Sequence, residues 1–200
     1  MISLLIFMML FCFQSIPAQA ESATETNERA DLMLADFHHH VTNGDELVKK
    51  AKAVLVLPRV YRIGLMSGNE HGEGVLRING KTEDYYLLDL LSNQLAAQRK
   101  SIILLFMQDS SLAKFRSRPT WKITEEAALG MPKTGKQGFL DIRKLEDPVI
   151  GFVIGRKGLI YDLSLAGAVF TRMKFEKEIH AEETAEISSG TSETTSELSP

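Results

Sequence analysis

The sequence predicts a single α+β domain around a curved, mostly antiparallel β-sheet or partly closed barrel, with N-terminal helices and one helix near 110–117. Its 200 residues are 44% hydrophobic, which suffices for one sizeable core but not clearly for two. Apolar runs of strand length, separated by glycine-containing turns, occupy much of residues 54–107 and 148–175. Helical spacing of apolar residues is found mainly before residue 54 and near residue 112.

The first 20 residues have the features of a secretory signal peptide. Residues 2–13 are apolar apart from Ser3, and Ala18-Gln19-Ala20 fits the small-residue cleavage rule. We therefore expect cleavage after Ala20 and secretion to the periplasm or envelope of a Gram-negative bacterium, with an uncleaved anchor as the alternative. Cys12 is the only cysteine, so a mature protein cleaved there could form no disulfide.

Two helices are predicted before the first strand. Residues 21–29 are polar and predict a disordered lead-in, whereas residues 30–40 have apolar residues near helical spacing and predict an amphipathic helix. Asn43-Gly44 ends that helix. Asp45 is then expected to cap a second helix, whose lysines near its C-terminal end suit the helix dipole.

Strands follow from Val54. The segments 54–58, 60–66, 74–78 and 84–91 predict strands, and Asn79-Gly80 predicts a two-residue hairpin turn between the last two. Residues 101–107 are apolar apart from Ser101, which predicts a buried central strand.

The C-terminal half continues with a helix, a loop and more strands. Asp109 or Ser110 is expected to cap a helix over 109–117 that buries Leu112 and Phe115. Residues 130–138 predict an exposed loop, and residues 148–175 predict two or three strands, the first pair joined through Gly155-Arg156-Lys157-Gly158. The acidic, Ser/Thr-rich residues 176–200 predict a disordered tail, which leaves 30–175 as the domain.

Glycines are concentrated in residues 62–81, yet the pattern is not that of a nucleotide-binding loop. No Lys-Ser/Thr pair follows the last glycine, and Gly72-Glu73-Gly74 leads into a strand rather than a helix. Glycine lacks Cβ and permits bulges, curvature or close approach of another strand. We therefore assign a structural role, shaping a curved sheet, to Gly64, Gly68, Gly72 and Gly74.

No catalytic or metal site emerges from the residue pattern. His71 and Glu73 share one face of a strand and could begin a zinc site, but no spaced His or Cys follows as a third ligand until His180. His38-His39-His40 point in different directions on a helix, and no G-x-S-x-G motif or mature cysteine offers a nucleophile. We expect neither an enzyme nor a cofactor or small-molecule substrate.

Charge is distributed unevenly along the chain. Residues 51–175 hold nineteen bases and twelve acids, net +7, whereas residues 176–200 hold seven acids and one base, net −6. A basic domain in an envelope compartment favours anionic phospholipid over nucleic acid as its partner. The candidate lipid-binding residues are Lys49, Lys50, Lys52, Arg59, Arg62, Arg156 and Lys157.

Four blocks, in order, resemble the SYLF domain family: "AKAVLVLPRV" (51–60), "SGNEHGEGVLRINGKTEDYY" (67–86), "KSIILLFMQDSSLAKFRS" (100–117) and "PVIGFVIGRKGLIYDLSLAGAVFTRM" (148–173). The secreted bacterial branch of that family is the most similar. The resemblance implies a lipid-binding module. The glycine block departs from the family pattern at 65–67 and 69–71, and the N-terminal helix is only loosely similar, so the choice of headgroup does not transfer.

The expected function is therefore non-enzymatic binding of anionic phospholipid through a basic surface. One alternative is a metal-dependent hydrolase centred on His71 and Glu73. Another is a structural envelope protein whose charges only keep it soluble.

Overall fold

A computed structural model describes residues 23–63, 68–92, 99–124, 129–131, 146–161 and 164–173. The predicted signal peptide, the predicted acidic tail, Gly64 and most of the predicted loop 130–138 lie outside these residues.

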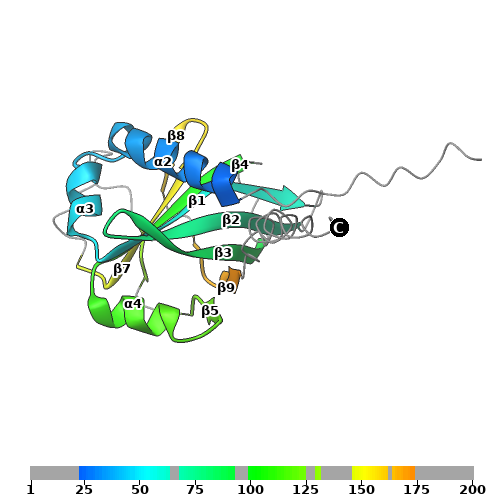
Figure 1. The fold of residues 1–200 in the computed structure, drawn as a ribbon. Coiled ribbons are helices and arrows are strands. Elements are labelled where there is room, and N and C mark those ends of the chain that lie inside the picture. Colours follow the sequence, from blue (N-terminus) through cyan, green and yellow to red (C-terminus); the bar gives the residue numbers. More distant parts are fainter. Residues whose placement is uncertain are drawn as a thin grey trace, which may run out of the picture.

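The described residues form one α+β domain in which a curled, nine-stranded sheet makes a half-barrel, as the sequence predicts (Figure 1). Neighbouring strands follow the order β5-β9-β3-β2-β1-β4-β7-β6, with β8 paired to β7. All pairings are antiparallel except β6 with β7. The strands are β1 (Ala53–Ile63), β2 (Gly68–Ile78), β3 (Lys81–Ser92), β4 (Arg99–Phe106), β5 (Thr120–Lys122), β6 (Leu129–Gly130), β7 (Val149–Gly155), β8 (Gly158–Ile160) and β9 (Val169–Met173).

Strand β1 is continuous where the sequence suggested two strands, and a bulge explains the interruption. The pairing with β2 shifts between Val56 and Arg59, and the pairing with β4 shifts between Leu57 and Val60. Pro58 has no amide hydrogen to donate to a ladder, and a bulge is one of the few places where a sheet accepts proline. Its carbonyl instead accepts a hydrogen bond of 2.8 Å from the Ser101 hydroxyl.

Two glycines of β2 lie against this bulge. A Cβ on Gly74 would stand 2.5 Å from the Val56 carbonyl oxygen, and a Cβ on Gly72 would stand 2.8 Å from the Arg59 carbonyl oxygen. Both distances are shorter than real Cβ contacts, so any larger residue would push β1 away. The close approach of the two strands at the bend is consistent with the predicted structural role of these glycines.

The hairpin between β2 and β3 turns at Asn79-Gly80, as predicted. Both residues have positive φ, 51° and 77°, which the favoured two-residue hairpin turn requires.

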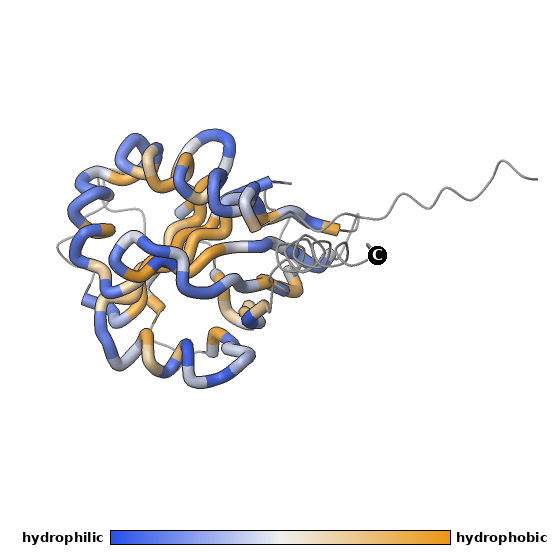
Figure 2. Tube along the Cα trace, in the orientation of Figure 1, coloured by the Kyte–Doolittle hydropathy of each residue, from blue (hydrophilic) through white to orange (hydrophobic). Residues whose placement is uncertain are grey.

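The sheet has apolar residues on both faces. On the face that curls inward, Phe115 of α4 (Asp109–Arg116) is fully buried, with its ring centroid 4.6 Å from that of Tyr86 and 4.8 Å from that of Phe106. On the other face, Phe37 of α2 (Ala23–His40) packs edge-on against Phe152. Figure 2 shows the hydrophobic residues gathered along the strands between α2 and α4.

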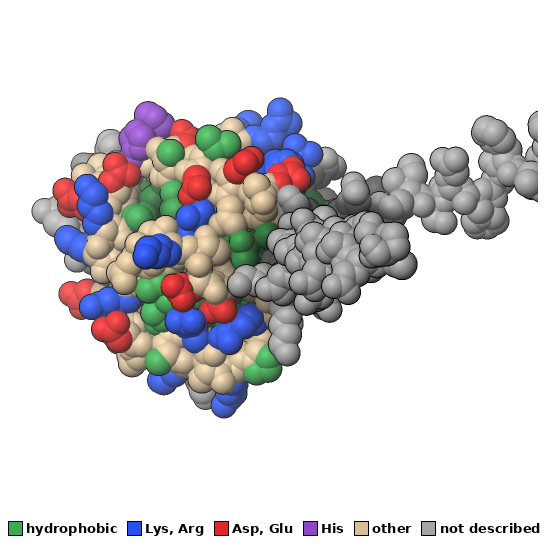
Figure 3. All heavy atoms as spheres, viewed as in Figure 1, with side chains coloured by type: hydrophobic (Ala, Val, Ile, Leu, Met, Phe, Trp, Pro, Cys, Tyr) green, Lys and Arg blue, Asp and Glu red, His purple; other side chains and the backbone are tan. Residues whose placement is uncertain are grey.

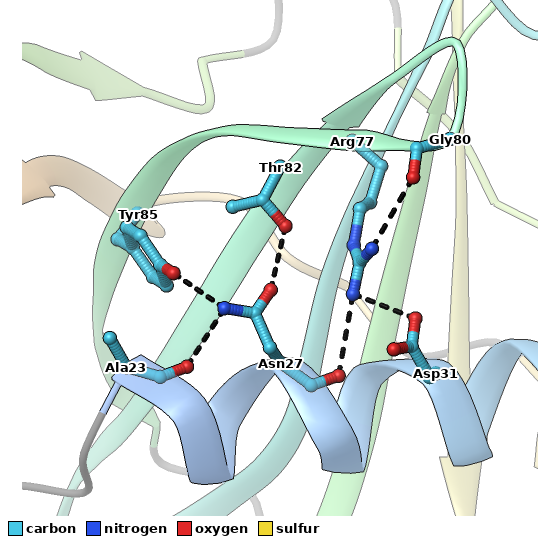
Figure 4. Close-up of polar contacts among 7 residues, drawn as sticks. All are labelled: Ala23, Asn27, Asp31, Arg77, Gly80, Thr82 and Tyr85. Carbon is cyan, nitrogen blue, oxygen red and sulfur yellow. Dashed lines mark hydrogen bonds and ion pairs between the residues drawn. The ribbon is translucent and has the colours of Figure 1, made fainter.

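Helix α2 is fixed to the β2–β3 hairpin by a polar network (Figure 4). The Asn27 side-chain amide donates to the Tyr85 hydroxyl at 2.5 Å, and its oxygen accepts from the Thr82 hydroxyl at 2.6 Å. Arg77 pairs with Asp31 one helical turn further on, at 2.7 Å.

Three local predictions about the helices were wrong. Residues 23–29, expected within a disordered lead-in, form the first turns of α2, because Thr26 and Ala30 are buried and Asn27 bonds to the hairpin. Asp45 does not cap α3 (Gly44–Lys50), since Asn43 occupies that position in a left-handed conformation. Likewise Gln108, rather than Asp109 or Ser110, precedes α4, and no side chain caps it.

Candidate functional site

The structure does not bring the seven predicted lipid-binding residues together. Lys49 and Lys50 end α3, and Lys52 follows just before β1, at the opposite end of that strand from Tyr61 and Ile63. Lys52 also pairs with Asp109 at 3.3 Å. Figure 3 shows cationic and anionic side chains interspersed over much of the visible face. The α3 lysines therefore form a separate group from the remaining candidates.

Arg59 and Arg62 lie on opposite faces of β1. The register places Arg59 opposite Glu73 and Arg62 opposite Glu70. Glu70 and Glu73 are three positions apart in β2, so their side chains point to opposite faces of the sheet. Arg62 lies on the inner face, where its Nε atom is buried. Arg59 lies on the α2 side. The hydrogen bond from Arg29 is the main cause that lowers the pKa of Glu25, and the charge of Arg59 makes the smallest contribution in the same direction.

Arg156 and Lys157 are exposed in the turn between β7 and β8, as predicted. Gly155, just before this turn, pairs with Lys100, so the turn lies beside the first residue of β4, Arg99. Arg99 is exposed and was not among the predicted residues. Because side chains alternate along a strand, the sequence could have placed Arg99 and Lys100 on opposite faces of the sheet. It could not have shown which residues lie next to Arg99 on the neighbouring strands.

Apolar side chains are exposed next to these cations. Tyr61 pairs with Arg99 across β1 and β4 and is 46% exposed. Ile63 and Leu91 both pair with Asn69 of β2, so they share its face, and they are 58% and 71% exposed. Together these residues define the strand-end patch, which consists of Tyr61, Ile63, Leu91, Arg99, Arg156 and Lys157.

The three cations of the strand-end patch have no ion-pair partner among the residues that the structure describes. In contrast, Lys52, Arg77, Arg116 and Arg172 each approach a carboxylate. Unpaired exposed cations keep their charge available for an external anion.

His71 lies within the same sheet surface but is engaged by a neighbour. Its Nδ1 atom is 2.5 Å from Asp89 Oδ1 across β2 and β3, and its ring is 6.4 Å from that of Tyr61. No group of three or more His, Cys, Asp or Glu residues able to hold a metal occurs in the described part of the chain. Asp89 therefore contacts His71 across the two strands, and no third candidate ligand joins them among the described residues.

The inner face beneath the patch contains a buried ion pair. Lys100 Nζ lies 2.5 Å from Glu70 Oε2, and both side chains are 2% exposed. Glu70 Oε2 accepts no hydrogen bond of acceptable geometry from the described residues, so the contact is an ion pair rather than a well-directed hydrogen bond. The pair joins β2 and β4 across β1, next to the strand ends that carry the patch.

The chain matches no protein-family model and no curated protein. The resemblance to the SYLF domain, which was drawn from four sequence blocks, therefore stays a prediction. Among the described helices, none is both long and apolar enough to cross a bilayer.

Proposed function

We propose that this protein is a non-enzymatic envelope protein that binds anionic phospholipid surfaces through the strand-end patch. The observation that supports the proposal most is the exposure of Tyr61, Ile63 and Leu91 beside three cations without carboxylate partners in the described residues. Exposed apolar side chains with cations along the β4–β7 side are complementary to a bilayer surface, whose interior is apolar and whose headgroups carry negative charge.

The magnitudes are sufficient for reversible binding. Each basic residue near an anionic membrane contributes about 1 kcal/mol, so Arg99, Arg156 and Lys157 together would contribute about 3 kcal/mol. Partial burial of Ile63 and Leu91 in the acyl boundary would add roughly 1–2 kcal/mol for each side chain. Tyr61 can place its ring at the headgroup level, which is the usual position of tyrosine at a membrane interface.

The envelope location is part of the same proposal and depends on residues 1–20. N-terminal sequencing of protein recovered from the periplasm of an expressing Gram-negative host would test it. A mature chain that begins at Glu21 is the expected result, and an intact N-terminus in the cytoplasm would contradict it.

Vesicle co-sedimentation tests the binding. Full-length mature protein should be retained on vesicles that contain phosphatidylglycerol, lost from pure phosphatidylcholine, and released as salt is raised. The triple variant Arg99→Gln/Arg156→Gln/Lys157→Gln should bind about 100-fold more weakly, which corresponds to about 3 kcal/mol.

The matched control removes the same number of charges elsewhere. Lys49, Lys50 and Lys81 are exposed and have no ion-pair partner among the described residues, so their replacement by Gln should change affinity much less. Equal losses in both triple variants would show that net charge alone drives retention, and would overturn the patch. Absence of retention on any vesicle would favour a purely structural protein.

The apolar contribution needs its own variant. Ile63→Ser/Leu91→Ser leaves every charge in place and removes exposed apolar surface, so binding should weaken by a similar factor at low and high salt. Unchanged vesicle binding by this variant would show that only the charged residues of the patch contribute to membrane contact.

A further inference from the structure

We infer that the acidic segment 176–200 of this chain docks in cis on a basic surface formed by α4, β5 and β9. This α4–β5 basic surface consists of Lys114, Arg116, Arg118, Lys122 and Arg172. It shares no residue with the strand-end patch, and the inference does not depend on lipid binding.

The surface has an excess of positive charge. Lys114, Arg118 and Lys122 are exposed and have no ion-pair partner in the part of the chain that the structure describes. Arg116 and Arg172 both approach Asp84, at 3.2 Å and 3.6 Å, and Arg116 is 3.9 Å from Glu83. The five cations thus outnumber the neighbouring carboxylates of Glu83, Asp84 and Asp109, the last of which pairs with Lys52. Figure 3 shows cationic side chains along the lower edge of the molecule, where Figure 1 places α4 and β5.

The acidic segment starts beside this surface. The Arg172 amide donates to the Pro119 carbonyl at 2.8 Å, and the Arg172 guanidinium donates to the Arg116 carbonyl at 2.6 Å. The last described residue, Met173, is therefore next to the C-terminal end of α4. Three further residues reach Glu176, a span of at most about 10 Å.

A surface depression of about 510 Å³ lies at the same place. Leu112 and Ala113 give it an apolar part, Ser117, Arg116 and Arg172 give it hydrogen-bond donors, and its one carboxylate, Asp109, pairs with Lys52 at 3.3 Å. The two arginines and the apolar part suit an acidic peptide with occasional apolar side chains, and residues 176–200 include Ile179, Ile187 and Leu198 among their acids.

Tethering makes a weak attraction sufficient. The segment holds seven acids and one base, net −6, and a short linker gives it an effective concentration of about millimolar at a neighbouring surface. The attraction between such charges is screened over about 8 Å at physiological ionic strength and over about 3 Å at 1 M salt. Docking should therefore be reversed by salt.

Paramagnetic relaxation in the full chain tests the inference. Because Cys12 is the only cysteine, Ser189→Cys in a Cys12→Ser background accepts a single spin label in the acidic segment. At low salt, amide signals of α4 and β5 should be broadened, and the broadening should be lost at about 1 M NaCl.

Charge-reversal variants identify the partner surface. Lys114→Glu/Arg118→Glu/Lys122→Glu should abolish the broadening, whereas the matched triple Lys49→Glu/Lys50→Glu/Lys81→Glu should preserve it. Far-ultraviolet circular dichroism checks that both variants remain folded. Broadening that survives the first triple, is located elsewhere, or is absent would overturn the inference.

A mixing experiment separates cis from trans docking. Spin-labelled protein without isotope is added to isotope-labelled protein without spin label. Little intermolecular broadening is expected, since the tether favours contact within one chain. Broadening of the same size as in the singly labelled chain would show docking between copies and would overturn the cis assignment.

Discussion

Lys100 and Glu70 form an ion pair within the inner face of the half-barrel, with 2.5 Å between Nζ and Oε2 and 2% exposure of each side chain. Taking both charges out of water costs free energy, which their attraction offsets only while both are present. We therefore expect the pair to add little net stability, although losing only one of its two partners should be costly.

Removal of one partner should be much more damaging than removal of both. Lys100→Met leaves the Glu70 carboxyl group buried without its lysine partner, so we expect a loss of about 3–5 kcal/mol in the free energy of unfolding. Lys100→Met/Glu70→Leu should recover most of that loss. Urea denaturation of the two single variants and the double variant measures this coupling, and additive losses would contradict it.

Gly74 should not tolerate a methyl group. Its Cβ would meet the Val56 carbonyl oxygen at 2.5 Å and Leu57 Cγ at 2.8 Å, and the backbone atom cannot move without opening the bulge. We expect Gly74→Ala to lower the free energy of unfolding by about 3 kcal/mol.

Gly151→Ala is the control for this substitution. The nearest atom to its Cβ is Met131 Sδ, at 2.7 Å, which belongs to a flexible side chain that can rotate away. A smaller loss is expected in chemical denaturation. An equal cost in both variants would mean that the backbone contact at the bulge is not what excludes a side chain.

Asn27 should control the attachment of α2. Asn27→Ala removes the hydrogen bonds to Tyr85 and Thr82, and we expect about 1–3 kcal/mol of destabilisation. Hydrogen exchange should accelerate first at α2 amides, since the loss is local to the helix and hairpin. Glu28→Ala, at an exposed neighbouring position, is the control, and equal exchange rates in the two variants would argue against the network.

Alkaline pH should weaken the fold through Tyr86. Burial raises the pKa of the Tyr86 phenol above its ordinary value of 10.0, although the hydrogen bond from Arg172 acts in the opposite direction. A folded-state pKa above the unfolded value means that the stabilisation is complete below about pH 10 and is lost as the pH rises through the raised pKa. Thermal unfolding across pH 9–11 should show a smaller decrease in Tyr86→Phe than in the wild type. The exposed Tyr61→Phe should behave as the wild type.

Short-range sequence patterns predicted much of the fold. Asn79-Gly80 specifies a turn with positive φ, the apolar run 101–107 specifies a buried strand, and Phe115 at helical spacing specifies a buried helix face. Each of these three features depends on the backbone preference of a few residues or on a local pattern of apolar residues, and both can be read from a short stretch of sequence. The start of α2 was missed because its first turns are held by contacts with Tyr85 and Thr82, 58 and 55 residues away.

The amino-acid sequence by itself determined the α+β class, the positions of most strands, and the surplus of positive charge in residues 51–175. Only the tertiary structure decided which charges lie close together. Strand register depends on long-range pairing, and a shift of one residue reverses every side chain between the two faces. Register is what separates Arg59 from Arg62 and brings Arg99 beside Tyr61 and the β7–β8 turn, a grouping that no spacing along the chain reveals.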